Sequence, residues 1–156
     1  MPNTIRLHRV LRATPDRIYR AFLDADAMAK WLPPHGFTGK VHHLDARVGG
    51  TRQICMEMQT PGGPMQMWFT GEHREVVENQ RLVYTEMVSD EDGNPASPET
   101  MGLPDGHSVT EVRVELDVVD GRTRMIMTHQ GIPAGSPGAA GWAMAFDKLA
   151  ALIAGQ

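Results

Sequence analysis

The stretch from Glu111 to Met127, EVRVELDVVDGRTRMIM, has the clearest structural pattern in the chain. From Val112 to Val118 apolar and charged residues alternate, which is typical of a strand with one face in a core and the other in water. Asp120-Gly121 is a hairpin-turn signal, and Met125 and Met127 continue the alternation beyond it. The stretch therefore predicts an antiparallel β-hairpin with one apolar face.

Weaker strand patterns lie upstream of this hairpin. They cover roughly residues 4–13, 37–44, 50–58, 65–70 and 81–88. Turn signals separate several of them, namely the glycines at 49–50, Pro61-Gly62-Gly63-Pro64 and Glu78-Asn79-Gln80. Short strands joined by such turns predict an antiparallel sheet.

Two short helices are expected after the first strand. Thr14-Pro15-Asp16 offers a hydroxyl cap, a proline at the first helical position and an acid near the positive end of the helix dipole. This helix should run to about Leu23. Asp24 or Asp26 is expected to cap a second helix, which Pro33-Pro34 ends just after Trp31.

A long helix is predicted at the end of the chain, from about Ser136-Pro137. Large apolar residues recur there at helical spacing, and alanines make up much of the remainder. The apolar stripe consists of Trp142, Phe146, Leu149 and Ile153. These elements together predict an α+β fold, one domain over residues 1–156, in which a curved antiparallel sheet wraps round the closing helix.

The composition excludes several classes of function. The formal net charge of the 156 residues is −4 and the basic residues are scattered, so the chain lacks an electrostatic footprint for nucleic acid. No apolar run approaches the roughly 20 residues that span a bilayer, and the first residues have no secretory pattern. Because Cys55 is the only cysteine, we expect a buried, inert thiol and a cytoplasmic protein.

Methionine is the most unusual feature of the composition, with 11 residues, most of the internal ones in predicted strands. Methionine side chains are flexible and polarisable, so they fill irregular cores and also line cavities for apolar molecules. Both interpretations stay open, because a cavity wall is a core that lacks one neighbour. The residues expected to line a cavity between sheet and closing helix are Trp31, Phe37, Met56, Met58, Met67, Phe69, Tyr84, Met125, Met127, His129, Trp142 and Phe146.

Polar side chains in the predicted strands are the candidates for chemistry. Tyr84 could offer its hydroxyl to a ligand, and His129 is either a polar group inside the cavity or a hydrogen-bonded core histidine. His42 and His43 are adjacent in a strand and should point to opposite faces, so we predict no shared metal site there.

An inward-facing acid would be a further candidate. Glu57, Glu72, Glu75 and Glu86 are expected to face water, because burying a carboxylate without a partner is costly. The sequence has no serine in a glycine-flanked elbow and no glycine-rich phosphate loop. No catalytic residue, metal site or cofactor is therefore assigned.

A polar segment precedes the Glu111–Met127 hairpin. Residues 89–108 contain Asp90-Glu91-Asp92-Gly93-Asn94-Pro95 and further prolines, which is the composition of a mobile surface loop. This segment, like an exposed sheet edge, is a candidate contact for a protein partner.

Four stretches of the chain resemble one known family. They are ATPDRIYRAF at 13–22, KWLPPHGFT at 30–38, VGG at 48–50 and GWAMAFDKL at 141–149. Together they are similar to the activator of heat-shock-protein ATPase homologues, within the START-like, Bet v 1-like (SRPBCC) superfamily. The resemblance covers nearly the whole length and implies a helix-grip fold, with a cavity between the sheet and the C-terminal helix.

The resemblance implies binding of diverse apolar molecules, with reactions in the cavity of a minority of members. We expect a cytoplasmic protein that holds an unidentified hydrophobic or amphipathic small molecule. One alternative is a non-enzymatic partner of a chaperone or of its own copy. Full chaperone activators carry an additional N-terminal domain, whereas here the domain is expected to begin almost at Met1, which weighs against a chaperone partner. The other alternative is a hydrolase or cyclase-like cavity enzyme that uses Tyr84, His129 or an inward acid.

Overall fold

The computed structural model describes residues 4–92, 94, 109–132 and 137–154. In chain order the elements are β1 (Thr4–Leu11), α1 (Pro15–Leu23), α2 (Ala25–Trp31), β2 (Thr38–Leu44), β3 (Thr51–Thr60), β4 (Gly63–Val77), β5 (Arg81–Ser89), β6 (Thr110–Val119), β7 (Arg122–Gln130) and α3 (Pro137–Ala154). Each predicted helix and strand is present, and β4 extends well beyond the alternating pattern at 65–70. Most of the polar segment at 89–108 lies outside the described residues.

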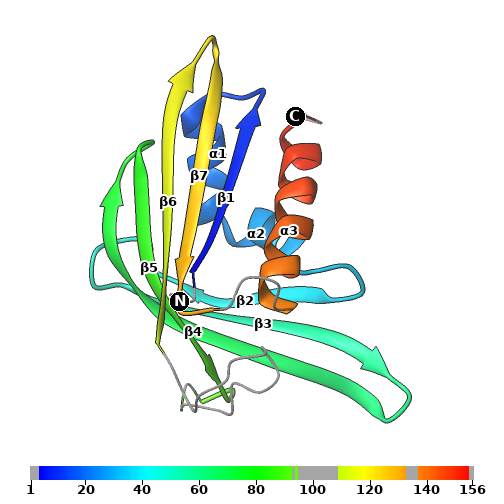
Figure 1. Cartoon of the computed structure of the whole chain (residues 1–156). Helices are drawn as coiled ribbons and strands as arrows, with labels where there is room; N and C mark the ends of the chain where they lie inside the picture. The colour runs from blue at the N-terminus through cyan, green and yellow to red at the C-terminus, as the bar shows by residue number, and fades with distance from the viewer. Residues whose placement is uncertain (1–3, 93, 95–108, 133–136, 155–156) are drawn as a thin grey trace.

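The strands form one antiparallel sheet in the order β1-β7-β6-β5-β4-β3-β2. The first two strands therefore lie at opposite edges, and α1 and α2 make the connection between them. The sheet curves round α3, with the two short helices on the same side (Figure 1). This arrangement confirms the predicted α+β helix-grip fold. We call the helix-covered side of the sheet the inner face and the opposite side the outer face.

The β6–β7 hairpin has the predicted turn and register. Asp120 and Gly121 have φ values of 52° and 76°, the backbone conformation of the tight turns that match strand twist. Leu116 pairs with Met125, and Val114 pairs with Met127. All four side chains are buried on the inner face.

The ends of the short helices follow from their sequences. Thr14 occupies the N-cap position of α1 without a side-chain capping hydrogen bond, while Pro15 begins the helix. At α2 the Asp24 carboxylate accepts a hydrogen bond of 3.0 Å from the Ala27 amide. An acid at this position satisfies a helix amide and complements the helix dipole.

Trp31, at the end of α2, joins the three helices. Its ring lies 4.8 Å from that of Phe22 on α1 and 6.3 Å from that of Phe146 on α3. Its indole nitrogen donates a hydrogen bond of 2.9 Å to the Ala21 carbonyl. The ring therefore contributes apolar burial while its polar edge stays satisfied.

The expectation that His42 and His43 point to opposite faces is wrong. A register shift between Val41 and His43 puts a bulge in β2, so simple alternation fails at this point. The His42 ring lies 4.7 Å from that of Trp68, a residue whose register assigns it to the outer face, and His43 lines an outer pocket. Both histidines therefore lie on the outer face.

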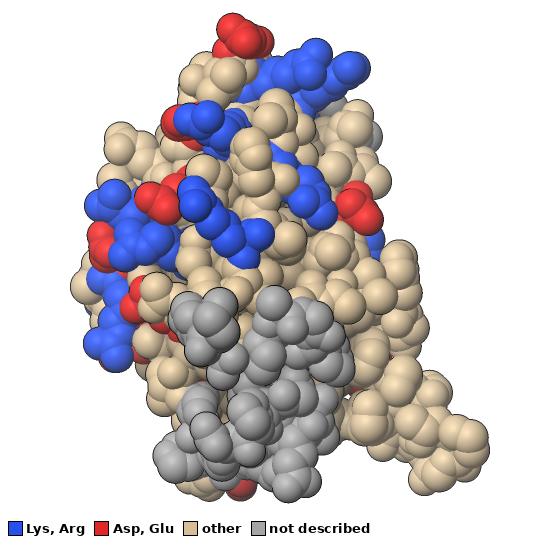
Figure 2. Space-filling model, in the orientation of Figure 1, with Lys and Arg blue, Asp and Glu red and all other residues tan. Residues whose placement is uncertain are grey.

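The β3–β4 hairpin extends beyond the part of the sheet that the helices cover (Figure 1). Residues 58–71 contain no charged side chain. In the space-filling view the hairpin projects as an uncharged tip, whereas charged side chains gather over the opposite end of the molecule (Figure 2).

Candidate ligand-binding site on the inner face

Four polar residues from three neighbouring strands lie on the inner face, and we call them the polar cluster: Arg52, His73, Tyr84 and Glu86. Arg52 pairs with Gly71 across β3 and β4, and His73 pairs with Tyr84 across β4 and β5. Since Gly71 and His73 are two residues apart on β4, the pairs share a face.

Arg52 is 3% exposed, which is unusual for a charged side chain. Its guanidinium carbon lies 3.7 Å above the centre of the Tyr84 ring, a cation–π contact. One of its nitrogens donates to the Met28 sulfur at 3.7 Å. Among the described residues no carboxylate oxygen lies within 4.0 Å of it, so the buried cation has no ion-pair partner there.

His73 is 1% exposed, and only one of its two ring nitrogens has a hydrogen-bond partner among the described residues. Its Nδ1 lies 3.3 Å from the Gly50 carbonyl oxygen, which can only accept, so Nδ1 carries the proton. Nε2 is then an acceptor, and it has no hydrogen-bond partner in the described part of the chain. Burial, and secondarily the charge of Arg52, lowers the pKa of His73, which keeps the ring neutral.

Tyr84 and Glu86 follow each other on the inner face of β5. Tyr84 is 2% exposed, and burial raises the pKa of its phenol while Arg52 opposes the rise. Glu86 is half-buried. Burial likewise raises the pKa of Glu86, against the attraction of Arg52. Glu86 is thus an inward-facing acid, contrary to the expectation that it faces water.

A chain of hydrogen bonds fixes α3 to the sheet beside the polar cluster. The Trp142 indole donates to His129 Nδ1 at 2.9 Å, and His129 Nε2 lies 2.8 Å from the Thr110 hydroxyl. That hydroxyl donates to the Glu86 carbonyl at 2.9 Å. Because Nδ1 accepts, His129 is the neutral Nε2–H tautomer, and burial lowers its pKa to about 4. His129 is therefore a satisfied core histidine without a free ring nitrogen.

Four methionines continue the inner face along the β3–β4 hairpin, and we call them the methionine patch: Met56, Met58, Met65 and Met67. They form two directly opposed cross-strand pairs, Met56 with Met67 and Met58 with Met65. Met65 is 36% exposed, and the other three are half-buried. The patch is thus apolar surface with incomplete cover, and the buried pair Ile54–Phe69 separates it from the polar cluster.

The residues expected to line a cavity fall into two environments. The half-buried ones are Phe37, Met56, Met58 and Met67. The buried ones pack in or beside the core: Trp31, Phe69, Tyr84, Met125, Met127, His129, Trp142 and Phe146. Met125 and Met127 are 0% exposed, so they contribute to the core of the β6–β7 side.

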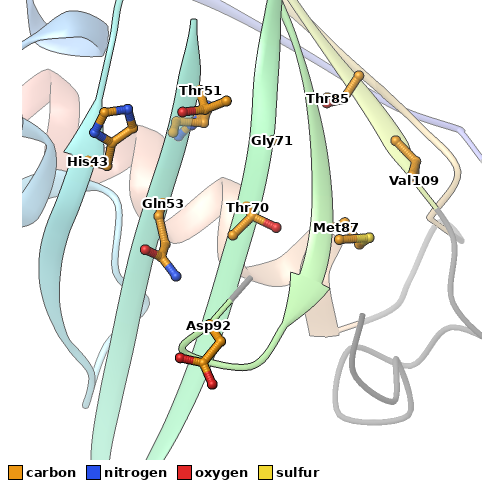
Figure 3. A pocket seen from close by; sticks show the side chains of 10 residues that line it. His43, Thr51, Gln53, Thr70, Gly71, Thr85, Met87, Asp92 and Val109 are labelled. Carbon is orange, nitrogen blue, oxygen red and sulfur yellow. The ribbon is translucent and has the colours of Figure 1, made fainter. Parts of the chain in front are cut away.

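A pocket of about 360 Å³ lies on the outer face, away from α3 (Figure 3). Its wall is a row of polar strand side chains with one methionine, and a short segment after β5 borders it. The lining residues are His43, Thr51, Arg52, Gln53, Thr70, Gly71, Thr85, Met87, Asp92 and Val109. Only Arg52 belongs to the polar cluster, and none belongs to the methionine patch.

Other expectations can be compared with the described ranges. Cys55 is buried with a free thiol, and burial raises its pKa, as expected for an inert cysteine. No three histidine, cysteine or acidic side chains converge as metal ligands among these residues. No helix within them has the length and hydropathy needed to cross a bilayer.

Sequence reasoning missed Arg52, His73 and Thr110. A signal for Arg52 exists, because it has the same parity as Ile54, Met56 and Met58 and so occupies an apolar-face position in its strand. His73 has no comparable signal. It precedes a register shift between His73 and Glu75, where β4 loses its alternation.

Comparisons with known proteins agree with this architecture. The family model of the Activator of Hsp90 ATPase homolog 1-like protein matches residues 12–154. A Chromobacterium violaceum protein of solved structure is 38% identical over 98% of each chain, with a TM-score of 0.80. The Silicibacter pomeroyi AHSA1 protein is 22% identical, with a TM-score of 0.70 and coverage of 97% of each chain.

A Mycobacterium smegmatis protein is also 22% identical, with a TM-score of 0.78, over 96% of this chain and 90% of its own. The two relatives at 22% identity show the fold alone. No curated protein matches the sequence. Since the family model spans nearly all of the chain, the protein belongs to the Activator of Hsp90 ATPase homolog 1-like family.

Proposed function

We propose that the protein binds a small amphipathic molecule on the inner face of its sheet, at the end formed by β3 and β4. The observation that carries the proposal is the incompletely covered methionine patch beside the polar cluster. Apolar surface contributes about 25 cal/mol per Å² when a ligand covers it, minus the cost of ordering the ligand. Methionine adapts to ligands of irregular shape.

The polar cluster supports an amphipathic ligand over a purely apolar one. A hydrocarbon would leave the Arg52 cation and the His73 acceptor unpaired in a dry site, which is unfavourable. A ligand with a polar end can pair with these groups while its apolar part covers Met58 and Met67. The buried pair Ile54 and Phe69 lies between the two regions, whereas Met56 and Glu86, both half-buried, leave part of each region accessible.

Titration with the neutral fluorophore N-phenyl-1-naphthylamine tests the binding site. We expect saturable binding to the wild type and at least severalfold weaker binding to Met67→Ser, since the hydroxyl removes apolar contact. Met87→Ser is the matched control, because Met87 is also half-buried in a strand but lies on the outer face. Equal weakening by both variants, or no binding to the wild type, would contradict the proposal.

Native mass spectrometry of protein isolated from cells identifies the ligand class. We expect an additional mass that is lost on organic extraction and that competes with the fluorophore when added back. An extracted compound that fails to displace the fluorophore would place its site elsewhere, with the outer pocket as the first alternative.

Self-association through the β3–β4 hairpin is the second candidate function. The observation that favours it is the uncharged projecting tip, with Met65 36% exposed. Analytical ultracentrifugation should then show a dimer that Met65→Lys converts to a monomer. A monomeric wild type at high micromolar concentration would rule this out and leave the ligand site unaffected.

A further inference from the structure

We propose that Arg52 binds the carboxylate of the ligand, so that the protein selects amphipathic acids over neutral molecules of the same length. This inference rests on the proposed function, and it assigns the ligand's head group. It starts from an arginine that is 3% exposed and has no carboxylate oxygen within 4.0 Å among the described residues.

The contacts of Arg52 orient its guanidinium and leave its charge without an ion-pair partner. The Tyr84 ring covers one face of the group at 3.7 Å, and the Met28 sulfur accepts one N–H. A thioether is a weak acceptor, whereas a guanidinium has five N–H donors. A carboxylate is the partner that this planar fork pairs with best.

The neighbours of Arg52 fit an acid that enters along the methionine patch. Met56 lies on the inner face of the same strand and is half-buried, with buried Ile54 between it and Arg52. The apolar chain of the acid would therefore lie across Ile54 and Met56 while its head group meets the cation. Glu86 is an acidic side chain on the same face, two residues beyond Tyr84 on β5. Burial raises its pKa, and wherever the carboxyl group is protonated it can donate a hydrogen bond to the incoming carboxylate instead of repelling it.

His73 adds a second interaction of a different kind. Its unpaired Nε2 accepts a hydrogen bond, so a ligand that carries a hydroxyl near its acid group would satisfy it. Arg52, which lacks an ion-pair partner among the described residues, and His73 come from β3 and β4 and lie on one face. The chemical class is therefore an amphipathic carboxylic acid, with a hydroxy acid favoured over its simple analogue.

Competition titrations against bound N-phenyl-1-naphthylamine test this selection with decanoate and 1-decanol. In the wild type, decanoate should displace the fluorophore at a concentration about tenfold or more below that of decanol, the range expected for a charge-assisted pair. Arg52→Gln should remove the difference between decanoate and decanol. Arg74→Gln is the matched control, because the Arg74 side chain is 58% exposed and forms only a 3.4 Å surface ion pair.

The outcomes separate the two proposals. If the wild type binds the fluorophore but does not distinguish decanoate from decanol, the role of Arg52 is wrong and the proposed site remains. If neither compound nor the fluorophore binds, the proposed function itself fails. Preference for the acid that persists in Arg52→Gln would also overturn the assignment.

A second measurement uses the wild type alone. It is needed because Arg52 contacts helix α2, so that replacing Arg52 could unfold the protein. The carboxyl resonance of [1-¹³C]decanoate bound to the wild type reports its own titration. Contact with Arg52 should hold the pKa of the bound acid below that of free decanoate. A bound acid that titrates above the free one would show an apolar environment without the cation, and would overturn the inference.

Discussion

The β6–β7 and β3–β4 hairpins carry similar side chains toward the same face of the sheet, yet their methionines differ in exposure. Met125 and Met127 are 0% exposed, whereas Met58 and Met67 are half-buried. The difference is cover, since α1 and α3 lie over the first hairpin and the second extends past the helices (Figure 1). The same residue type therefore packs a core in one place and offers a surface in the other.

The largest expected effect is on stability. Met127→Ala should lower the free energy of unfolding by about 2–5 kcal/mol, because a fully buried side chain leaves a cavity. Met67→Ala should lower it by less than about 1 kcal/mol, since water already reaches that side chain. Urea denaturation of both variants measures the contrast. Similar losses at the two positions would show that both hairpins belong to one closed core.

The hydrogen-bonded His129 on β7 predicts a pH effect. Its pKa in the folded protein is about 4, below the ordinary 6.5, so the unfolded chain binds more protons between these values. The contribution of His129 to the free energy of unfolding is therefore fully present above pH 6.5, and about 3 kcal/mol of it is lost as the pH drops to 4. His73, whose pKa is also lowered, acts in the same direction.

Urea denaturation at several pH values checks this prediction. His129→Gln should flatten the dependence between pH 6.5 and 4, and the exposed His35→Gln should retain it. A wild-type slope that is unchanged in His129→Gln would assign the acid sensitivity to other groups.

A substitution at Gly71, on β4, tests how closely β4 and β5 approach each other beside the polar cluster. A Cβ at this position would overlap the Thr85 carbonyl oxygen, which is backbone and cannot rotate away. Gly71→Ala should therefore lower the free energy of unfolding by about 1–3 kcal/mol. Gly62→Ala, in the exposed hairpin turn, should change it by less than about 0.5 kcal/mol. Equal thermal shifts for the two variants would show that β5 moves freely.

The smallest expected effect concerns Glu86. If a ligand carboxylate pairs with Arg52, Glu86→Gln should raise the affinity for decanoate about threefold at high pH, because it removes a competing negative charge. In the wild type the affinity should fall as the pH rises through the raised pKa of Glu86. Isothermal titration calorimetry across pH measures both. A wild-type affinity that is constant with pH would mean that Glu86 lies too far from the bound acid to affect it.

Local patterns accounted for most of the fold. Alternation from Val112 to Val118, the Asp120-Gly121 turn and the stripe from Trp142 to Ile153 each depend on neighbours in sequence, and each element is present. The bulge that places His42 and His43 on one face was not predictable, because it depends on pairing between β2 and β3.

The candidate site was less predictable than the fold. Tyr84 was among the expected candidates, and Glu86 was one of four acids expected to face water. Arg52 and His73 were not expected in a site. Arg52 matters because the described residues around it include no carboxylate partner, and His73 matters because they include no donor for its Nε2. These surrounding residues are distant in sequence. A strand pattern states which face a side chain occupies, and it does not state which groups from other strands meet it there.

The individual strands and turns, the short helices after β1 and the long closing helix follow from periodicity and turn chemistry, which act over a few residues. The pairing of β1 with β7 depends on the tertiary structure. Contacts across the sheet decide which methionines are buried. They also decide which ring nitrogen of His129 carries its proton and where the charge of Arg52 is buried. Burial and polar pairing are properties of the assembled chain, because they are set by the neighbours that folding brings together.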